Sequence, residues 1–93
     1  MLDGGLTFRV EKMFMLPDGG KLRAFADVNV NGVLIIRGCR VLDGKNGLFF
    51  SLPQEQGKDN KWYDIIQCKT TNVFAMMSEE VLTHYRNEQV KKG

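Results

Sequence analysis

The stretch Arg40–Pro53, which reads Arg-Val-Leu-Asp-Gly-Lys-Asn-Gly-Leu-Phe-Phe-Ser-Leu-Pro, predicts a strand, a turn and a second strand. Asp43-Gly44 and Asn46-Gly47 stand between two apolar runs, and glycine accepts the positive φ that a sharp reversal needs. Pro53 lacks a backbone donor and therefore ends the second strand. The chain is predicted to form an antiparallel pair of strands here.

The residues before this stretch predict an antiparallel meander. Residues 6–10 alternate apolar and polar side chains, and a slip of phase at Met13-Phe14-Met15 predicts a bulge or a strand end. The segment Pro17-Asp18-Gly19-Gly20 predicts a turn. Residues 22–30 alternate again, and Asn31-Gly32 is the dipeptide of a tight hairpin. Three successive strands are therefore expected to pair with their neighbours.

The third strand, Val33 to Leu42, is apolar on both faces apart from Arg37 and Arg40. Such a run is typical of a central strand that is covered on both sides. Gly38 stands between the arginines and predicts a bulge or a close approach of another backbone.

The second half of the chain predicts a loop, a short strand and a helix. Residues 54–61 are polar and read as a mobile loop, and Trp62 to Cys68 reads as a further strand. Thr70, Thr71 or Asn72 is expected to cap a helix, and Ser78 is a second possible cap that would break it near Met77. The apolar stripe of this helix consists of Phe74, Met77, Val81 and Tyr85, widened by Leu82. The predicted fold is α+β: a twisted antiparallel sheet of about five strands with a C-terminal α-helix on one face.

Length and composition predict one domain over residues 1–93. The chain has 93 residues, of which 43% are hydrophobic and 26% charged, as in an ordinary globular protein. No apolar run approaches the ~20 residues that span a bilayer, and the N-terminal residues lack a basic region followed by an apolar block. The cytoplasm is therefore the expected location, with no membrane partner.

The sequence holds few residues that could form a metal, cofactor or catalytic site. Two cysteines and one histidine are too few for the usual set of zinc ligands, so no metal and no cofactor is predicted. Cys39 could act as a nucleophile with His84 as its base. The alternative, a core thiol in the most apolar strand, is favoured, so no enzyme is predicted.

Basic and aromatic side chains are the main candidates for binding. The basic candidates are Arg9, Lys12, Lys21, Arg23, Arg37, Arg40, Lys45, Lys58, Lys61 and Lys69. Basic groups on a sheet neutralise phosphates, and Phe25, Phe49, Trp62 and Tyr63 could stack on unpaired bases. The alternative is that the basic groups only solvate the surface and the aromatic groups fill the core.

Several motifs resemble the SpoVG family of bacterial sporulation and septation regulators. They are Leu22-Arg23-Ala24, the run Val41–Phe49, Tyr63-Asp64-Ile65 and the helical Val81–Tyr85, and the resemblance covers roughly Leu6 to Glu88. The resemblance implies a small cytoplasmic homodimer that binds DNA or RNA and regulates gene expression or cell division, without enzymatic activity.

The chain departs from the family pattern at three places. Gln54-Glu55-Gln56 replaces a serine with a lysine-arginine pair, Gln67-Cys68-Lys69 replaces His-Pro-Ile, and Phe74 replaces an arginine near the helix start. A helix N-terminus with basic neighbours is a natural anion site, so these departures weaken that expectation.

The residues predicted to contact phosphate are Arg37, Arg40, Lys45, Lys58, Lys61 and Lys69, with Arg23 a weaker member. Among the six stronger candidates, Arg40 alone also matches the family pattern. The second hypothesis is a dimeric protein–protein interaction module without direct nucleic-acid binding, because edge pairing would bury an exposed sheet edge.

Overall fold

The computed structural model describes residues 5–17 and 20–92 of the chain. Within these residues the elements are β1 (Phe8–Met15), β2 (Leu22–Val30), β3 (Leu34–Gly44), β4 (Gly47–Ser51), β5 (Gln54–Gln56), β6 (Trp62–Asp64) and α1 (Thr71–Lys92). Strands β1 to β4 form one antiparallel sheet in the order of the sequence, and β5 and β6 form a separate two-stranded sheet. The α+β class and the C-terminal helix are confirmed.

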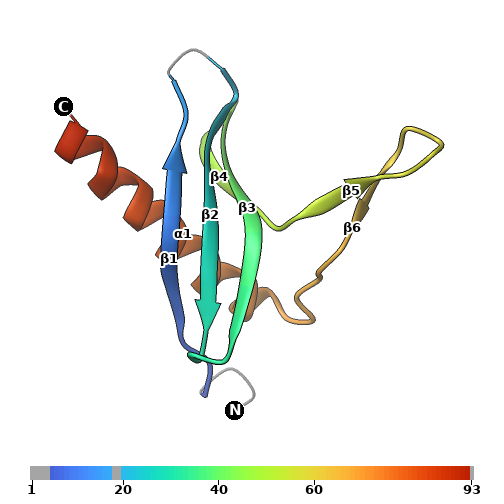
Figure 1. Ribbon diagram of the computed structural model, residues 1–93, viewed down its shortest axis with the longest axis horizontal. Coiled ribbons are helices and arrows are strands. Elements are labelled where there is room, and N and C mark those ends of the chain that lie inside the picture. Colours follow the sequence, from blue (N-terminus) through green and yellow to red (C-terminus); the bar gives the residue numbers. More distant parts are fainter. Residues whose placement is uncertain (1–4, 18–19, 93) are drawn as a thin grey trace.

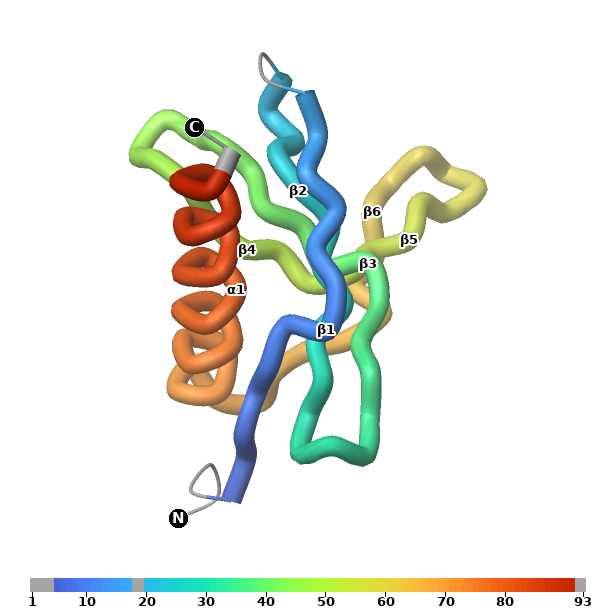
Figure 2. Tube along the Cα trace, turned by 60° about the vertical axis from the view of Figure 1, so that its left-hand side comes forward, coloured from blue at the N-terminus to red at the C-terminus, as the bar shows by residue number. Residues whose placement is uncertain are grey.

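Helix α1 packs across one face of the four-stranded sheet, and the β5–β6 hairpin projects away from both (Figures 1 and 2). The helix contacts all four strands of that sheet. The core between them consists of Val10, Ala24, Ala26, Val28, Cys39, Val41, Phe50, Leu52, Met77, Val81 and Tyr85. Small residues on β2 allow the helix to approach the middle of the sheet closely, because alanine side chains leave room for the larger helical ones.

The hairpin between β2 and β3 was predicted correctly. Asn31 and Gly32 have φ values of 55° and 73°, and the Val33 amide donates a 3.0 Å hydrogen bond to the Val30 carbonyl. Positive φ at both central residues matches the right-handed twist of the flanking strands. Part of the turn expected at 17–20, namely Asp18 and Gly19, lies outside the described residues.

The pairing within the main sheet has three register shifts, one in the β1–β2 pair and two in the β2–β3 pair, of which one lies between Leu22 and Ala24. In β1 the register shifts between Val10 and Lys12, which is upstream of the slip that the sequence indicated at Met13–Met15. In the β2–β3 pair the register shifts opposite Gly38, whose φ of 81° confirms the bulge predicted there. An additional residue in one strand lets the apolar side chains on both sides of the bulge face the helix.

Three expectations about the strands were wrong. The strand predicted at Val33–Leu42 is paired on both edges, but it is covered on one face alone, since Ile35 is 45% exposed. The polar segment 54–61 is not simply a loop, because residues 54–56 form β5. The strand predicted at 62–68 ends at Asp64 and pairs with β5, not with the main sheet. A single helix covers a single sheet face, and this explains the first error.

The helix begins where its cap was predicted and runs without a break. The Thr70 hydroxyl accepts a 3.3 Å hydrogen bond from the Val73 amide, as a capping side chain does. Met77, Val81 and Tyr85 are buried, while Phe74 remains partly exposed. Ser78 lies inside the continuous helix, so the predicted break near Met77 is absent from the described helix.

Candidate nucleic-acid interface

The sheet face opposite α1 carries a transverse row of planar side chains. Phe14 on β1 pairs with Phe25 on β2, and Phe25 pairs with Arg40 on β3. Side chains that are directly opposite one another on neighbouring strands share a face and lie next to each other. The neighbours Met13, Ala24 and Val41 point to the helix side and contribute to its packing. We call the face that holds Phe14, Phe25 and Arg40 the open face.

Arg40 also connects the open face to the β5–β6 hairpin. Its guanidinium carbon lies 5.5 Å from the centroid of the Trp62 ring, within the range of a cation–π contact. Trp62 is nevertheless 53% exposed, and Phe14 and Phe49 are 52% and 48% exposed. The open face therefore presents a positive charge among solvent-accessible aromatic rings.

Arg37 is held by the β3 bulge against a buried carboxylate. Its guanidinium nitrogen lies 3.3 Å from Oδ2 of Asp27, and the Gly38 amide donates a 3.4 Å hydrogen bond to Oδ1 of the same residue. Asp27 is 7% exposed, so its charge needs these partners. Arg37 remains accessible at its outer side, but part of its charge is compensated by Asp27.

The charges of strands β1–β4 are divided unequally between the two faces. Strand alternation and register place Arg9, Lys12, Arg37 and Arg40 on the open face with Glu11 and Asp27, whereas Arg23 and Asp43 lie on the helix side. Glu11 accepts a 2.8 Å hydrogen bond from Asn29, and Asp27 is buried. Both acidic groups are thus engaged, and the accessible charge of this face is positive.

The structure does not bring all seven predicted phosphate ligands together. Arg37 and Arg40 lie on the open face, and Lys45 lies in the turn between β3 and β4. Lys58 and Lys61 lie at the tip of the β5–β6 hairpin, and Lys69 precedes α1. Arg23 is on the other side of the sheet, where it contacts Tyr85 and Asp43.

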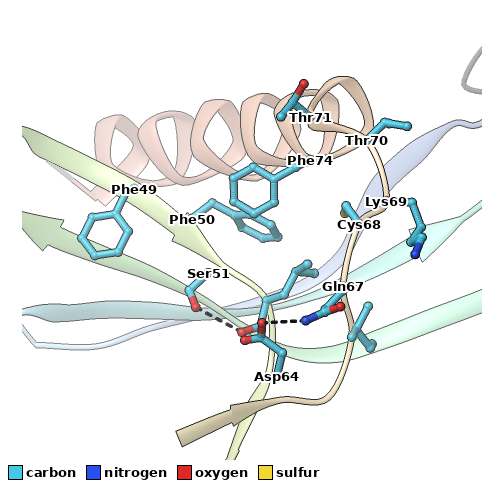
Figure 3. A pocket seen from close by; sticks show the side chains of 12 residues that line it. Phe49, Phe50, Ser51, Asp64, Gln67, Cys68, Lys69, Thr70, Thr71 and Phe74 are labelled. Carbon is cyan, nitrogen blue, oxygen red and sulfur yellow. Dashed lines mark hydrogen bonds between the residues drawn. The ribbon is translucent and has the colours of Figure 1, made fainter.

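A shallow groove lies between β4 and the start of α1 (Figure 3). It has a volume of about 510 Å³ and is lined by Phe49, Ser51, Asp64, Gln67, Lys69 and Phe74, among others. The Phe74 ring packs on Phe50 with centroids 5.5 Å apart. Phe74, which stands where the family pattern has an arginine, therefore packs at the edge of the core. Asp64 accepts hydrogen bonds from Gln54 and Gln67, at 2.8 and 3.4 Å.

The hairpin tip is organised by Asp59. Its carboxylate accepts hydrogen bonds from the Tyr63 hydroxyl at 2.5 Å and from the Lys61 amide at 3.0 Å. The Tyr63 hydroxyl is the main cause that lowers the pKa of Asp59, and Asp59 in turn raises the pKa of Tyr63. Asp59 stands between Lys58 and Lys61 in the sequence, so its charge offsets part of the positive charge of the tip.

The alternative of a catalytic cysteine is not supported by the geometry. Cys39 is fully buried, and this burial raises its pKa to about 12, so the thiol is protonated at neutral pH. Its sulfur donates to the Ile36 carbonyl, whereas His84 lies 3.8 Å from Glu88 on the helix. Among the described residues no group of three or more His, Cys, Asp or Glu side chains is placed to hold a metal ion.

Sequence reasoning did not single out Phe14. It belongs to the segment Met13–Met15, in which three apolar residues follow one another and alternation is lost. The bulge at Glu11 turns Met13 and Met15 toward the helix and Phe14 toward the open face. The slip of phase was the available signal, but its exact position depends on pairing with β2.

Comparison with known proteins agrees with the resemblance seen in the sequence. The SpoVG family model matches residues 7–87. This chain belongs to the SpoVG family. It is 33% identical over 66 residues to a septation protein, SpoVG 2, of Listeria monocytogenes, a match that covers 71% of this chain and 65% of that protein. It is 32% identical over 66 residues to SpoVG septation proteins of Bacillus cytotoxicus and Priestia megaterium, with 71% of this chain covered and 68% and 69% of theirs.

The names of these SpoVG relatives describe septation proteins and not enzymes. The match spans slightly less than two thirds of the length of the Listeria protein. Within the described residues, no helix is long and apolar enough to cross a membrane.

Proposed function

We propose that this SpoVG-family chain is a cytoplasmic nucleic-acid-binding regulator of gene expression or septation that acts as a small dimer without catalytic activity. The observation that carries the proposal is the open face, where Arg40 stands among exposed aromatic rings and the acidic groups are buried or hydrogen-bonded. Guanidinium and ammonium groups at such a surface attract phosphates and release counterions on binding.

Membership of the SpoVG family supports the regulatory part of the proposal. The relatives are named for septation. Arg40 is the predicted ligand that both matches the family pattern and lies on the open face. Lys45 lies in the turn that follows β3, the strand that carries Arg40.

A second candidate function is a dimeric protein–protein interaction module. β4 is an outer strand of the sheet, and its residues Gly47–Ser51 include no charged side chain. The other outer strand, β1, carries Arg9, Glu11, Lys12 and a bulge, features that discourage pairing with another chain. β4 is therefore the edge on which a second copy or a partner strand fits best.

The proposal is tested with the double variant Arg40→Ala/Lys45→Ala. Fluorescence anisotropy with labelled single-stranded RNA, single-stranded DNA and duplex DNA is recorded at several salt concentrations. We expect weaker binding and a salt slope reduced in magnitude by up to about two, because two phosphate contacts are lost. The matched control is Arg86→Ala/Lys91→Ala, which removes the same charge from exposed positions on α1.

Two results would count against this function. Unchanged binding by a folded Arg40→Ala/Lys45→Ala variant would remove these residues from the interface. Absence of binding at low salt by a wild-type dimer, with the oligomeric state measured by light scattering, would favour the interaction module instead.

A further inference from the structure

The open face and the β5–β6 hairpin form one continuous surface of planar groups. The row runs from Phe14 through Phe25 to Arg40 by strand pairing, and Arg40 reaches Trp62 on β6. The row therefore crosses three strands of the sheet and ends on the hairpin. Phe49 lies beside it, opposite Leu42 on β3. We call Phe14, Phe25, Arg40 and Trp62 the aromatic row.

We propose that the aromatic row binds single-stranded nucleic acid by stacking unpaired bases on its rings and on the Arg40 guanidinium. This inference rests on the proposed nucleic-acid binding and specifies which class of nucleic acid the site selects. Unpaired bases offer π-faces to aromatic and guanidinium planes, whereas a duplex keeps these faces stacked inside the helix. A sheet with exposed aromatic side chains is a suitable platform for such bases.

Charge on the open face favours nucleic acid over an uncharged protein partner. Arg9 and Lys12 share this face, and the structure shows no hydrogen bond or ion pair between either of them and another described residue. Protein interfaces are enriched in arginine and aromatic residues but depleted in lysine, so Lys12, and not Arg40, is the residue that disfavours an uncharged protein partner. Phosphates that follow a strand of stacked bases would pair with these cations.

The β5–β6 hairpin lies next to Arg40, a position that suits the binding of bases at the aromatic row. In Figure 1 the β5–β6 hairpin extends from the body, and Trp62 on β6 contacts Arg40 of the main sheet. A hairpin with strands of three residues gains little stability from its own pairing. Bases that stack on Trp62 and on the neighbouring rings of the sheet would therefore hold the hairpin against the sheet.

The test uses the full chain with two variants that keep an apolar side chain at each position and remove its π-face, Phe14→Leu and Trp62→Leu. The probes are labelled oligothymidylate and oligouridylate of about 12 nucleotides, within the range of a small single-strand site, and a mixed-sequence duplex of the same length. We expect the wild-type chain to bind the single strands more tightly than the duplex. Each substitution should weaken single-strand binding at least about fivefold and leave duplex binding unchanged.

Trp62 supplies a second readout because it is the single tryptophan of the chain. Stacking of a base on its ring should quench its fluorescence when a single strand is added, and the duplex should not. The matched control is Phe74→Leu, which removes an aromatic ring from the start of α1, on the other side of the sheet. This variant should bind single strands as the wild-type chain does.

The outcomes separate this inference from the proposed function. Equal, salt-dependent binding of single strands and duplex, unaffected by Phe14→Leu and Trp62→Leu, would overturn the aromatic row and leave nucleic-acid binding intact. Loss of binding in Phe74→Leu alone would place the binding site at the helix start and would also overturn the inference about the aromatic row. No binding of any probe by the folded wild-type chain would overturn both. If Phe14→Leu and Trp62→Leu instead convert a dimer to a monomer at unchanged affinity, the row is a self-association surface and the inference is wrong.

Discussion

The Nε atom of Arg23 donates a 3.2 Å hydrogen bond to the hydroxyl of Tyr85, and this contact joins strand β2 to helix α1. Tyr85 is 2% exposed, so its hydroxyl depends on protein partners for hydrogen bonding. Arg23 also lies 4.0 Å from Asp43 at the end of β3. The arginine therefore connects the sheet and the helix on the face opposite to the aromatic row.

We predict that Tyr85→Phe lowers the free energy of unfolding by about 1–2 kcal/mol, since a hydrogen bond to a charged donor is lost. Arg23→Ala should cost at least as much, because it leaves the buried Tyr85 hydroxyl without this donor. Urea denaturation of both variants and of the double variant measures the two costs and their coupling. A coupling energy near zero would show that the two side chains contribute independently.

Arg86→Ala is the control for this pair. Arg86 follows Tyr85 on the same helix and is exposed, so its removal should change stability by less than about 0.5 kcal/mol. A cost equal to that of Arg23→Ala would indicate a general effect of positive charge instead of the specific contact.

Elements with local signals could be predicted from the sequence. The Asn31-Gly32 hairpin, the Gly38 bulge and the capping region of α1 each depend on residues that are close in the chain. In the hairpin, the short turn also sets which residues of the two strands lie opposite one another. Local chemistry is sufficient for such features because it decides backbone conformation directly.

Features that depend on distant contacts were missed or misplaced. Gln54–Gln56 is polar throughout, and its pairing with β6 leaves no alternating pattern to detect. The open face could not be recognised from the sequence, because the strand at 33–42 is apolar on both sides. Tertiary packing decides which of these two sides the helix covers. The contact between Arg40 and Trp62 likewise depends on the path of the whole hairpin.

Gly38→Ala should destabilise the protein by about 1–2 kcal/mol, the usual cost of the left-handed conformation for a residue with a Cβ atom. The φ of Gly38 is 81°, and no atom lies within 4 Å of an added Cβ, so backbone strain and not a clash is the cause. Urea denaturation measures the cost. Gly20→Ala is the control, because its Cβ would meet the Leu22 carbonyl at an ordinary 3.9 Å. Equal stability of wild type and Gly38→Ala would show that the bulge relaxes at no cost.

The two cysteines should differ in reactivity. Burial raises the pKa of both thiols, but Cys39 is fully buried and Cys68 is only half-buried. Because the thiolate is the reactive form, a thiol reagent at neutral pH should modify Cys68 first and Cys39 at the rate of unfolding. Peptide mass spectrometry after timed labelling distinguishes the two sites. In the control Cys68→Ser, rapid native-state labelling of the remaining thiol would contradict the burial of Cys39.

The bond between Asp59 and Tyr63 should stabilise the hairpin tip over a defined pH window. The pKa of Asp59 is lowered from 3.8, first by the Tyr63 hydroxyl, so its contribution is present above pH 3.8 and lost as the pH falls through the folded-state pKa. The pKa of Tyr63 is raised from 10.0 by Asp59, so its contribution is present below pH 10.0 and lost as the pH rises through the folded-state pKa.

Asp59→Asn tests this coupling directly. Removal of the carboxylate charge should bring the titration midpoint of Tyr63, followed by the NMR signals of its ring, back toward 10.0. Asp64→Asn is the control on the same hairpin, because Asp64 contacts Gln54 and Gln67 and not the tyrosine hydroxyl. It should leave the Tyr63 midpoint where it is in the wild-type chain. An equal shift in both variants would mean that the overall charge of the hairpin, and not the 2.5 Å bond to Asp59, raises the pKa of Tyr63.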